Sequence, residues 1–397
     1  MAIEKEPNHV QESAAELPKF ETGRHSEEDK REREKAAKKE RLRVQFDAPK
    51  EIKTAVGEKL KYVRLDPENL RSEVPITYIK GWATTNEPYE EFMLDLVGTS
   101  NRTLLSVDNP HGIDSGDLSE NKKLKEAKKN IGQIPDSRIE LRKTAATEEM
   151  IKNEGVKVTD IVAHSEGALQ AVLYALENLE KVRNIVLIGS TGMIENDTVR
   201  DLVERAKKDT DLQNQNTKDK LAGINPRNRP RYQKIKDPES GKEINVLLPK
   251  INLGYDVSPE ELKAQGREIQ ENTRWGLIEK MKLIAKKPLA DLDSIKTIAA
   301  ADIAPALEFL RAKRIRVGFI HAVDDKLMDY ERVREHSSKK LMDGSYTVQG
   351  THCSFAHNPE KHALMVADLL NGLERKRKSD EIKKSIVGSK NETACRK

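Results

Sequence analysis

The sequence predicts an α/β protein with a mostly parallel, doubly wound sheet, helices on both faces and an inserted, mainly helical lid. Short apolar runs alternate with longer helical patterns through the middle of the chain. One of these runs passes through a very tight turn, flanked by the small residues Ala163 and Gly167, directly into a helix. A long polar stretch, 195–300, then interrupts the alternation. The 397 residues suffice for one large catalytic domain with such an insertion.

Five apolar runs bounded by polar or turn residues are expected to form buried strands of this sheet. They are 75–80, 103–108, 159–163, 184–189 and 315–322. A helix is predicted between the second and third runs, because Ser137 and Glu140 have capping-box spacing and the pattern ends just before Gly155. Strand, helix and strand in this order, joined by right-handed crossovers, give a parallel sheet.

The polar stretch 195–300 is predicted to be the lid. It contains the Asn- and Pro-rich run 225–230, and a new helix is expected where Ser258 precedes Pro259 and two acidic residues. An insertion here would lie over the carboxyl ends of the strands, where open α/β sheets bind ligands. The chain is therefore divided into a core of 44–194 and 301–374 around a lid of 195–300.

Both ends of the chain are strongly charged. Residues 27–43 are nearly all charged, and such a segment can form a solvated helix but has no apolar face to bury. Residues 1–43 are therefore expected to be a disordered or transiently helical arm, and 375–397 a basic polar tail.

Charge and composition exclude several classes of protein. The net charge of +4 is the small difference between 71 basic and 67 acidic residues, which argues against a nucleic-acid partner. An RNA-associated protein would bind with a steep salt dependence that we do not expect here. The first ten residues lack the apolar run of a secretory signal, and no segment approaches the roughly 18 apolar residues of a membrane span. A cytoplasmic location without a transmembrane segment is expected.

Cofactors and metals are not expected either. The chain has two cysteines, Cys353 and Cys395, too few for a disulfide framework or a thiolate metal cluster. No pair of histidines has the spacing of an HExxH metal site.

The tight turn at Ser165 is the predicted nucleophile. A serine in a strained strand-to-helix turn needs small neighbours, and Ala163 and Gly167 stand two residues before and after it. The backbone N–H of Glu166, at the start of the helix, would help to stabilise an oxyanion. The alternative is a serine that merely caps a helix, but the strand before it and the helix after it favour a nucleophile.

A serine needs a base and an acid to become reactive, and in this architecture they follow in the order acid, then histidine. The run 315–322 leads into Asp324 and Asp325 at the carboxyl edge of the sheet; Asp325 fits better, and Asp324 remains the alternative. His352 follows Gly350 on a loop that could reach over the serine, which makes it the predicted base.

The remaining site candidates are a second oxyanion donor and the other histidines. The loop after 75–80 begins with Gly81 and Trp82, and the backbone N–H of Trp82 is the predicted donor; its indole could equally be a core or lid aromatic. Four histidines are expected to be structural or solvated because they lie in the elbow, in a strand, or in or beside the last helix: His164, His321, His357 and His362.

Together these motifs resemble the α/β-hydrolase family, in its lidded esterase, lipase and proline-iminopeptidase-like branch. The likeness runs over about 44–374. It is carried by five pieces in order: Lys80-Gly81-Trp82, where the family has His-Gly-x; the turn at 108–115; Ala163-His-Ser-Glu-Gly167; the strand leading to Asp325; and Gly350-Thr-His352. The chain departs from the family at Asp329, where proline is frequent, at Ala322, where glycine is frequent, and in its long lid.

The resemblance implies a serine hydrolase that cleaves a small ester-like substrate, namely a carboxylic ester, thioester or lactone, through an acyl-enzyme. Ser165, His352 and Asp325 would form its triad, with Trp82 and Glu166 as the oxyanion hole and no cofactor or metal. Two alternatives stay open: an acyltransferase with the same triad, and a non-hydrolytic ligand-binding protein. The sequence predicts neither the substrate nor the oligomeric state.

Overall fold

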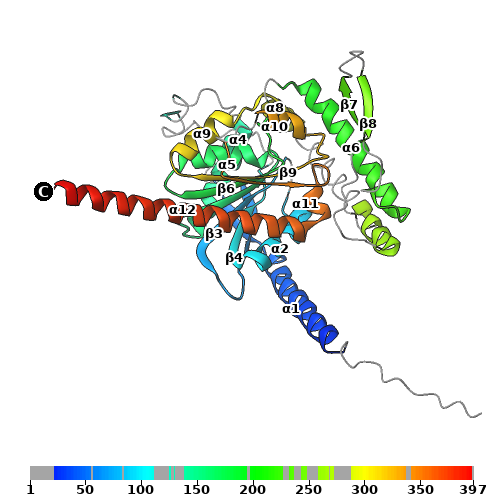
Figure 1. Ribbon diagram of the computed structural model, residues 1–397, viewed down its shortest axis with the longest axis horizontal. Helices are drawn as coiled ribbons and strands as arrows, with labels where there is room; N and C mark the ends of the chain where they lie inside the picture. Colours follow the sequence, from blue (N-terminus) through cyan, green and yellow to red (C-terminus); the bar gives the residue numbers. More distant parts are fainter. Residues whose placement is uncertain are drawn as a thin grey trace, which may run out of the picture.

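The computed structural model describes residues 22–54, 57–82, 85–110, 125–126, 129, 138–194, 197–226, 232–236, 243–247, 258–267, 269–271, 288–336 and 341–395 (Figure 1). Its centre is an eight-stranded sheet in the order β1-β2-β4-β3-β5-β6-β9-β10. Only β2 runs against its neighbours in this sheet, so the sheet is mostly parallel, as predicted. The strands are β1 (Lys50–Lys53), β2 (Lys59–Leu65), β3 (Ser72–Ile79), β4 (Arg102–Val107), β5 (Thr159–His164), β6 (Val182–Ile188), β9 (Arg316–Ala322) and β10 (Gly344–Val348).

The five expected strands are all present as β3, β4, β5, β6 and β9, with ends within three residues of the prediction. The hairpin of β1 and β2 was not predicted. Its alternating charged and apolar residues leave one face exposed, so it lacks the continuous apolar run of a central strand. β10 lies at the opposite edge of the sheet.

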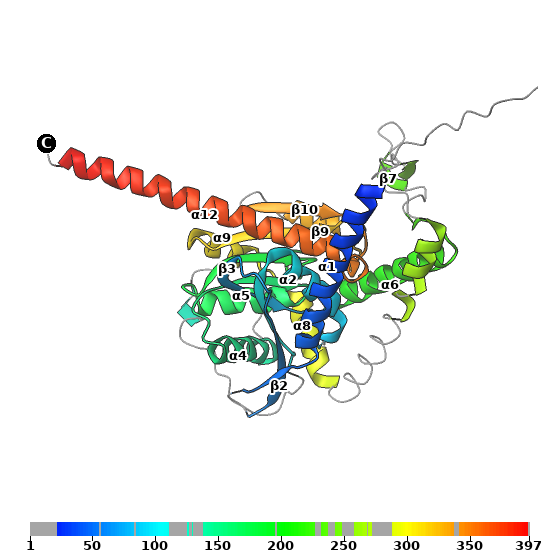
Figure 2. The same ribbon diagram turned by 90° about the horizontal axis from the view of Figure 1, so that it is seen from below.

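Helices cover both faces of the sheet, as predicted (Figure 2). α4, α5 and α9 pack on one face, and α2 and α12 on the other. The helices of the body are α2 (Glu90–Ser100), α4 (Arg138–Asn153), α5 (Gly167–Glu177), α9 (Ala304–Ala312), α10 (Tyr330–His336), α11 (Ser354–His357) and α12 (Pro359–Cys395), with a short 3-10 helix η1 (Glu87–Tyr89). α4 ends before Gly155 as expected, whereas its predicted cap, Ser137, lies outside the described residues.

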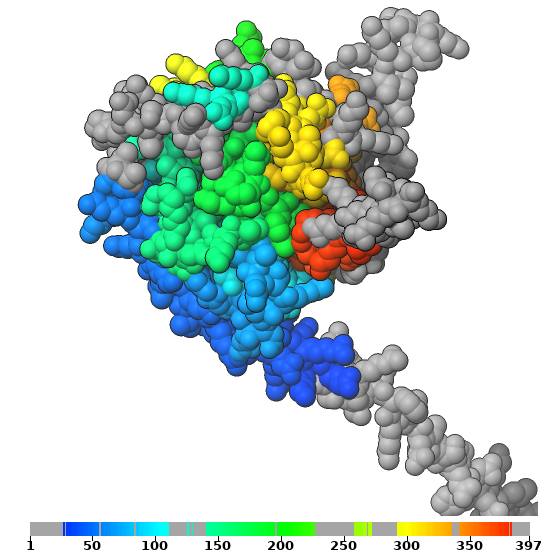
Figure 3. Space-filling view, turned by 90° about the vertical axis from the view of Figure 1, so that its left-hand side faces the viewer, coloured from blue at the N-terminus to red at the C-terminus, as the bar shows by residue number. Residues whose placement is uncertain are grey.

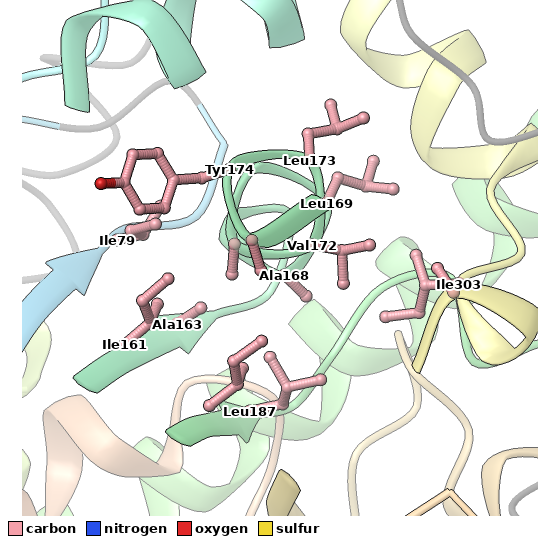
Figure 4. Packing of buried hydrophobic residues seen from close by; sticks show 14 of the residues in the cluster. Ile79, Ile161, Ala163, Ala168, Leu169, Val172, Leu173, Tyr174, Leu187 and Ile303 are labelled. Atoms are coloured by element: carbon pink, nitrogen blue, oxygen red, sulfur yellow. The ribbon is translucent and has the colours of Figure 1, made fainter. Parts of the chain in front are cut away.

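The central strand β5 shows why the apolar runs lack alternation. Ile161 and Ala163 belong to the core beneath α5, whereas Val162 between them belongs to the core on the opposite face. Figure 4 shows Ala168 and Val172 on the side of α5 that faces β5 and β6, in the first of these cores. Because its side chains are buried on both faces of the sheet, β5 has a fixed position, and so does the turn with Ser165 that follows it.

Within the stretch predicted to be the lid, 195–300, the structure describes several helices and one pair of strands. α6 (Val199–Leu221) begins at Thr198, whose hydroxyl accepts the N–H of Asp201 at 3.1 Å. β7 (Tyr232–Lys236) and β8 (Glu243–Leu247) form an antiparallel hairpin that was not expected. A helix begins after Ser258 as predicted, since the serine hydroxyl accepts the N–H of Glu261 at 3.2 Å. Most of the run 225–230 lies outside the described residues.

The last helix of the predicted lid, α8 (Pro288–Ala300), packs on the body. Ala299 is buried in the core beneath α5, and Ile295 and Ile298 pack against that core. Ile303, just after α8, donates its N–H to the carbonyl of Gly192 at 2.9 Å.

The described part of the charged arm is helical. It forms one helix, α1 (Thr22–Phe46), which protrudes from the body but buries Leu42 and Phe46 at its end (Figure 3). Lys39 pairs with Asp95 of α2 at 2.7 Å, and Arg43 pairs with Glu90 at 2.9 Å. The segment therefore does have an apolar contact, confined to its last turns. None of the helices described by the structure is both long enough and apolar enough to cross a membrane.

Candidate active site

Ser165 lies in the turn between β5 and α5 with a backbone φ of 53°, a left-handed conformation that is rare for residues other than glycine. Its N–H donates to the carbonyl of Ile188 at 3.0 Å, which fixes the turn against β6. Gly167 shows why the turn needs small residues. A Cβ atom at this position would lie 2.5 Å from the carbonyl oxygens of both Ile79 and Lys80.

His352 lies beside this serine, on the loop after β10. Its Nε2 is 2.9 Å from Oγ of Ser165, and its Nδ1 is 2.8 Å from Oδ2 of Asp325. Because a carboxylate can only accept, the histidine Nδ1 carries the proton in this arrangement and Nε2 is left to accept from the serine. Three residues that are distant in the sequence are thus joined by two hydrogen bonds.

The two neighbouring aspartates have different positions. Asp325 is only 1% exposed, and its Oδ1 accepts the N–H of Met328 at 2.8 Å while Oδ2 faces the histidine. Asp324 instead uses its backbone N–H, which donates to the carbonyl of Gly350 at 3.0 Å. The structure therefore brings Asp325 to the histidine, and Asp324 connects the two loops.

Gly189, directly after β6, makes room for the imidazole. It has a φ of 50°, and a Cβ atom there would lie 3.3 Å from the His352 ring and 3.5 Å from Oδ2 of Asp325. Sequence reasoning did not single out this glycine. Its position at the end of a predicted strand was the signal that could have indicated it.

The two predicted oxyanion donors belong to peptide groups whose carbonyl oxygens each accept a hydrogen bond from a side chain. Nδ2 of Asn109 donates to the carbonyl of Gly81 at 3.0 Å, and this carbonyl shares a peptide plane with the N–H of Trp82. The carbonyl of Ser165, which shares a plane with the N–H of Glu166, accepts from Oγ1 of Thr191 at 3.0 Å. The C=O and N–H of a trans peptide point in opposite directions, so each hydrogen bond also sets the direction of the N–H.

The loop after β3 lies close to the serine. A Cβ atom on Gly81 would be 3.1 Å from Cβ of Ser165 and 3.2 Å from Nδ1 of His164. The Trp82 peptide follows immediately, and its indole is half-buried. The structure thus brings both predicted donor peptides, Gly81–Trp82 and Ser165–Glu166, to one place.

A buried ionic cluster lies beneath the turn. Nζ of Lys143, on α4, is 2.7 Å from Oε2 of Glu166 and 3.0 Å from Oε1 of Glu140. Burial and the neighbouring Glu166 raise the pKa of Glu140 well above its ordinary value, although Lys143 opposes this shift. Lys143 thus lies between the carboxyl groups of Glu140 and Glu166, beneath the serine turn.

Aromatic rings support the histidine from the side. The His164 ring centre is 5.1 Å from that of His352 and 4.1 Å from that of Phe355, and Phe355 stacks on Tyr89. His164 was expected to be structural, and it lies in the wall of the site. His321 lies deeper: its Nε2 is 2.7 Å from the carbonyl oxygen of Met328, and burial lowers its pKa.

The other two histidines do not join the site. Burial, with smaller contributions from nearby cations, lowers the pKa of His357 to about 4. Burial likewise lowers the pKa of His362 to about 4, and its Nδ1 is 2.9 Å from the carbonyl oxygen of Asn358. Both imidazoles are therefore neutral near pH 7.

Asp209 of α6 is a further acidic residue beside the site, and sequence reasoning missed it. Its Oδ1 accepts the N–H of Lys326 at 3.0 Å and that of His352 at 3.4 Å. Burial raises its pKa, and His352 opposes the shift. No sequence signal separated this aspartate from the other acids of a polar helix.

Among the residues that the structure describes, no group of three or more His, Cys, Asp or Glu side chains is arranged to hold a metal ion. Hydrogen bonds join a hydroxyl, an imidazole and a carboxylate at this site, next to two peptide N–H groups whose directions are fixed.

Among known proteins, the chain is similar to solved structures. No protein-family model matches the chain, and no curated protein matches it. A membrane phospholipase A, described as a bacterial virulence factor, is 14% identical over 86% of this chain and 92% of its own, with a TM-score of 0.44. The esterase EaEST from Exiguobacterium antarcticum is 12% identical over 81% and 98%, with a TM-score of 0.47. A meta-cleavage product hydrolase from Pseudomonas fluorescens IP01 is 14% identical over 81% and 97%, with a TM-score of 0.46.

The strand order gives the fold. A mostly parallel eight-stranded sheet has one antiparallel strand, β2, near one edge. A strained serine turn follows the central strand β5, an aspartate follows β9, and a histidine follows the edge strand β10. Such an arrangement is typical of one architecture. The chain has the α/β-hydrolase fold.

Proposed function

We propose that the protein is a serine hydrolase that cleaves an ester-like bond of a small molecule through an acyl-enzyme. The observation that carries this proposal is the line of hydrogen bonds from Ser165 Oγ to His352 Nε2 and from His352 Nδ1 to Asp325, at 2.9 and 2.8 Å. A hydroxyl becomes a strong nucleophile when a neutral imidazole takes its proton during attack, and these distances are within hydrogen-bonding reach.

The first half of the reaction forms the acyl-enzyme. His352 Nε2 takes the Ser165 proton as Oγ attacks the substrate carbonyl, and Asp325 stabilises the imidazolium that results. The N–H groups of Trp82 and Glu166 hold the oxyanion of the tetrahedral intermediate. The bond from the acyl carbon to the leaving oxygen or sulfur then breaks, and that atom takes the proton from Nε2.

The second half releases the acid. A water molecule gives its proton to His352 Nε2 while its oxygen attacks the acyl carbon, and the intermediate collapses with return of the proton to Ser165. The fixed carbonyls of Gly81 and Ser165 support the assignment of the oxyanion donors, because donors held in place before the reaction need no reorganisation. The proposed substrate class is a carboxylic ester, thioester or lactone, because each has an acyl carbon and a leaving group that this chemistry can displace.

The test is labelling with a fluorophosphonate probe together with hydrolysis of p-nitrophenyl and thioester substrates. Ser165→Ala should abolish labelling and turnover, and His352→Ala should lower both by roughly a thousandfold or more, with the fold intact. Ser100→Ala is the matched control, because this buried serine only donates to the carbonyl of Leu96 on α2, away from the site.

Two results would contradict the proposal. One is wild-type turnover in Ser165→Ala, which would mean that another group attacks the substrate. The other is a wild-type protein that neither reacts with the probe nor turns over any of these substrates. An added alcohol or thiol acceptor in the same assay separates hydrolysis from acyl transfer, since hydrolysis predicts the carboxylic acid as the main product.

A further inference from the structure

The buried carboxylate of Asp209 connects the two loops of the proposed triad. One oxygen, Oδ1, accepts the N–H of Lys326 and the N–H of His352, at 3.0 and 3.4 Å. Lys326 directly follows Asp325, so a single atom on α6 lies between the acid loop and the histidine loop. The other oxygen, Oδ2, accepts Nε2 of Gln213 at 2.8 Å.

A second contact fixes α6 in the same place. Arg205 lies one turn before Asp209 and therefore on the same face of the helix. Its Nε donates to the carbonyl of Leu327 at 2.8 Å, and Asp197 pairs with the other two guanidinium nitrogens. Two successive turns of α6 therefore hold the acid loop, and only Asp209 of these two also reaches the histidine loop.

Charge gives Asp209 a second effect on His352. The groups that face this histidine are Asp325 after β9, Ser165 and His164 at the end of β5, His321 on β9, and Asp209 on α6. Two of these are carboxylates, and an ionised carboxylate favours the imidazolium form. Asp209 is 4% exposed, so water screens its charge weakly.

We infer that Asp209 is a positioning residue of the triad: from α6 it fixes the spacing of Asp325 and His352, and its charge stabilises the imidazolium. The role of Asp209 in catalysis rests on the proposed function. The stretch that carries α6 then contributes to the catalytic geometry.

The experiment compares three variants by their rate of fluorophosphonate labelling between pH 5 and 9. Asp209→Asn keeps an acceptor oxygen and removes the charge, whereas Asp209→Ala removes both. Asp211→Asn is the matched control, because Asp211 carries the same charge on the exposed side of α6. A second readout, independent of turnover, is the NMR titration of the His352 imidazole in histidine-labelled protein, assigned with His352→Gln.

In Asp209→Asn, two midpoints should fall by roughly half a pH unit or more: that of the pH dependence of labelling and that of the NMR titration of His352. The reason is that the imidazolium loses a nearby anion. In Asp209→Ala, labelling on the high-pH plateau should fall by about tenfold or more, because the loops are no longer held in register. Asp211→Asn should give the wild-type profiles.

The inference is overturned if Asp209→Asn titrates like Asp211→Asn in the NMR measurement. It is also overturned if Asp209→Ala labels at the wild-type rate. If Asp209→Ala fails to fold, the titration of Asp209→Asn alone decides. A shift in that titration combined with labelling that persists in Ser165→Ala would refute the proposed function while supporting the link between Asp209 and His352.

Discussion

Gly167 occupies a place with no room for a side chain, and this makes it a sensitive probe of the serine turn. A Cβ atom there would lie 2.5 Å from two backbone oxygens, those of Ile79 and Lys80, which cannot move without displacing β3. We expect Gly167→Ala to lower the free energy of unfolding by about 3 kcal/mol. It should also lower fluorophosphonate labelling, because the turn and the adjacent peptide of Glu166 must shift. Urea denaturation and labelling kinetics measure the two effects.

Gly98 supplies the control with the opposite sign. It lies on the exposed side of α2, and apart from its chain neighbours and the backbone of its own helix no atom lies within 4 Å of the position that a Cβ would take. Gly98→Ala should therefore raise the free energy of unfolding by about 0.5–1 kcal/mol, since alanine favours a helix. Equal effects of the two substitutions would show that the turn relaxes far more easily than its contacts indicate.

At the residue scale, the sequence was informative where chemistry and spacing coincide. Ser165 and Asp325 could be proposed because each follows an apolar run expected to be a strand, and His352 because it follows Gly350 on a loop. The structure brings the three side chains together. Asp209 and Asn109 could not, because their roles depend on which backbone groups happen to lie beside them. A hydrogen bond between distant segments leaves no local pattern in the chain.

At the scale of elements, α4 is joined to the serine turn by the buried cluster of Glu140, Lys143 and Glu166. Burial and Glu166 raise the pKa of Glu140 in the folded protein well above its ordinary value, although Lys143 opposes this shift. In the unfolded chain it ionises near pH 4.3. The folded state therefore binds one more proton, and this group makes the protein less stable as pH rises from about 4.5 toward its folded pKa.

Glu140→Gln removes this titration, since glutamine resembles the protonated carboxyl in shape. The free energy of unfolding of the variant should increase relative to wild type as pH rises, by at most about 1.4 kcal/mol per unit. Urea denaturation at pH 5, 6, 7 and 8 measures the difference. Glu149→Gln on the outer side of α4, where Glu149 pairs with Lys152 at 3.2 Å, is the control. Parallel curves for Glu140→Gln and wild type would mean that Glu140 is ionised in the folded protein.

The burial of each strand explains which elements could be predicted from the sequence. Strands buried on both faces, such as β5 and β6, are continuous apolar runs and were found. β1 and β2 have one solvated face, and β7 and β8 carry charged or polar residues at alternate positions, so neither pair has such a run. α8 was assigned to the lid because it continues a polar stretch. Its contacts with the body leave no pattern in the sequence that could have shown otherwise.

At the scale of the whole molecule, the charged end segments leave the body in different ways. α12 begins on the sheet face beside α2 and continues outward as a long helix, with Leu370 and Leu373 among its last buried residues (Figure 1). α1 approaches the same layer from the other direction and contacts it only near its end, at Leu42 and Phe46. The helical form of α1 therefore depends on an apolar contact as well as on its charges.

Phe46 should be the residue that anchors α1, because it is 7% exposed within the core of α2 and α12, whereas Val44 on the same helix is 64% exposed. Phe46→Ala should lower the free energy of unfolding by about 3 kcal/mol, the ordinary cost of removing a buried aromatic ring. Val44→Ala should change it by less than about 0.5 kcal/mol. Guanidinium denaturation measures both, and limited proteolysis should cut α1 faster in Phe46→Ala alone. If high salt released α1 in the wild type while Phe46→Ala left it protected, the ion pairs of Lys39 and Arg43, rather than the ring, would hold this helix to the body.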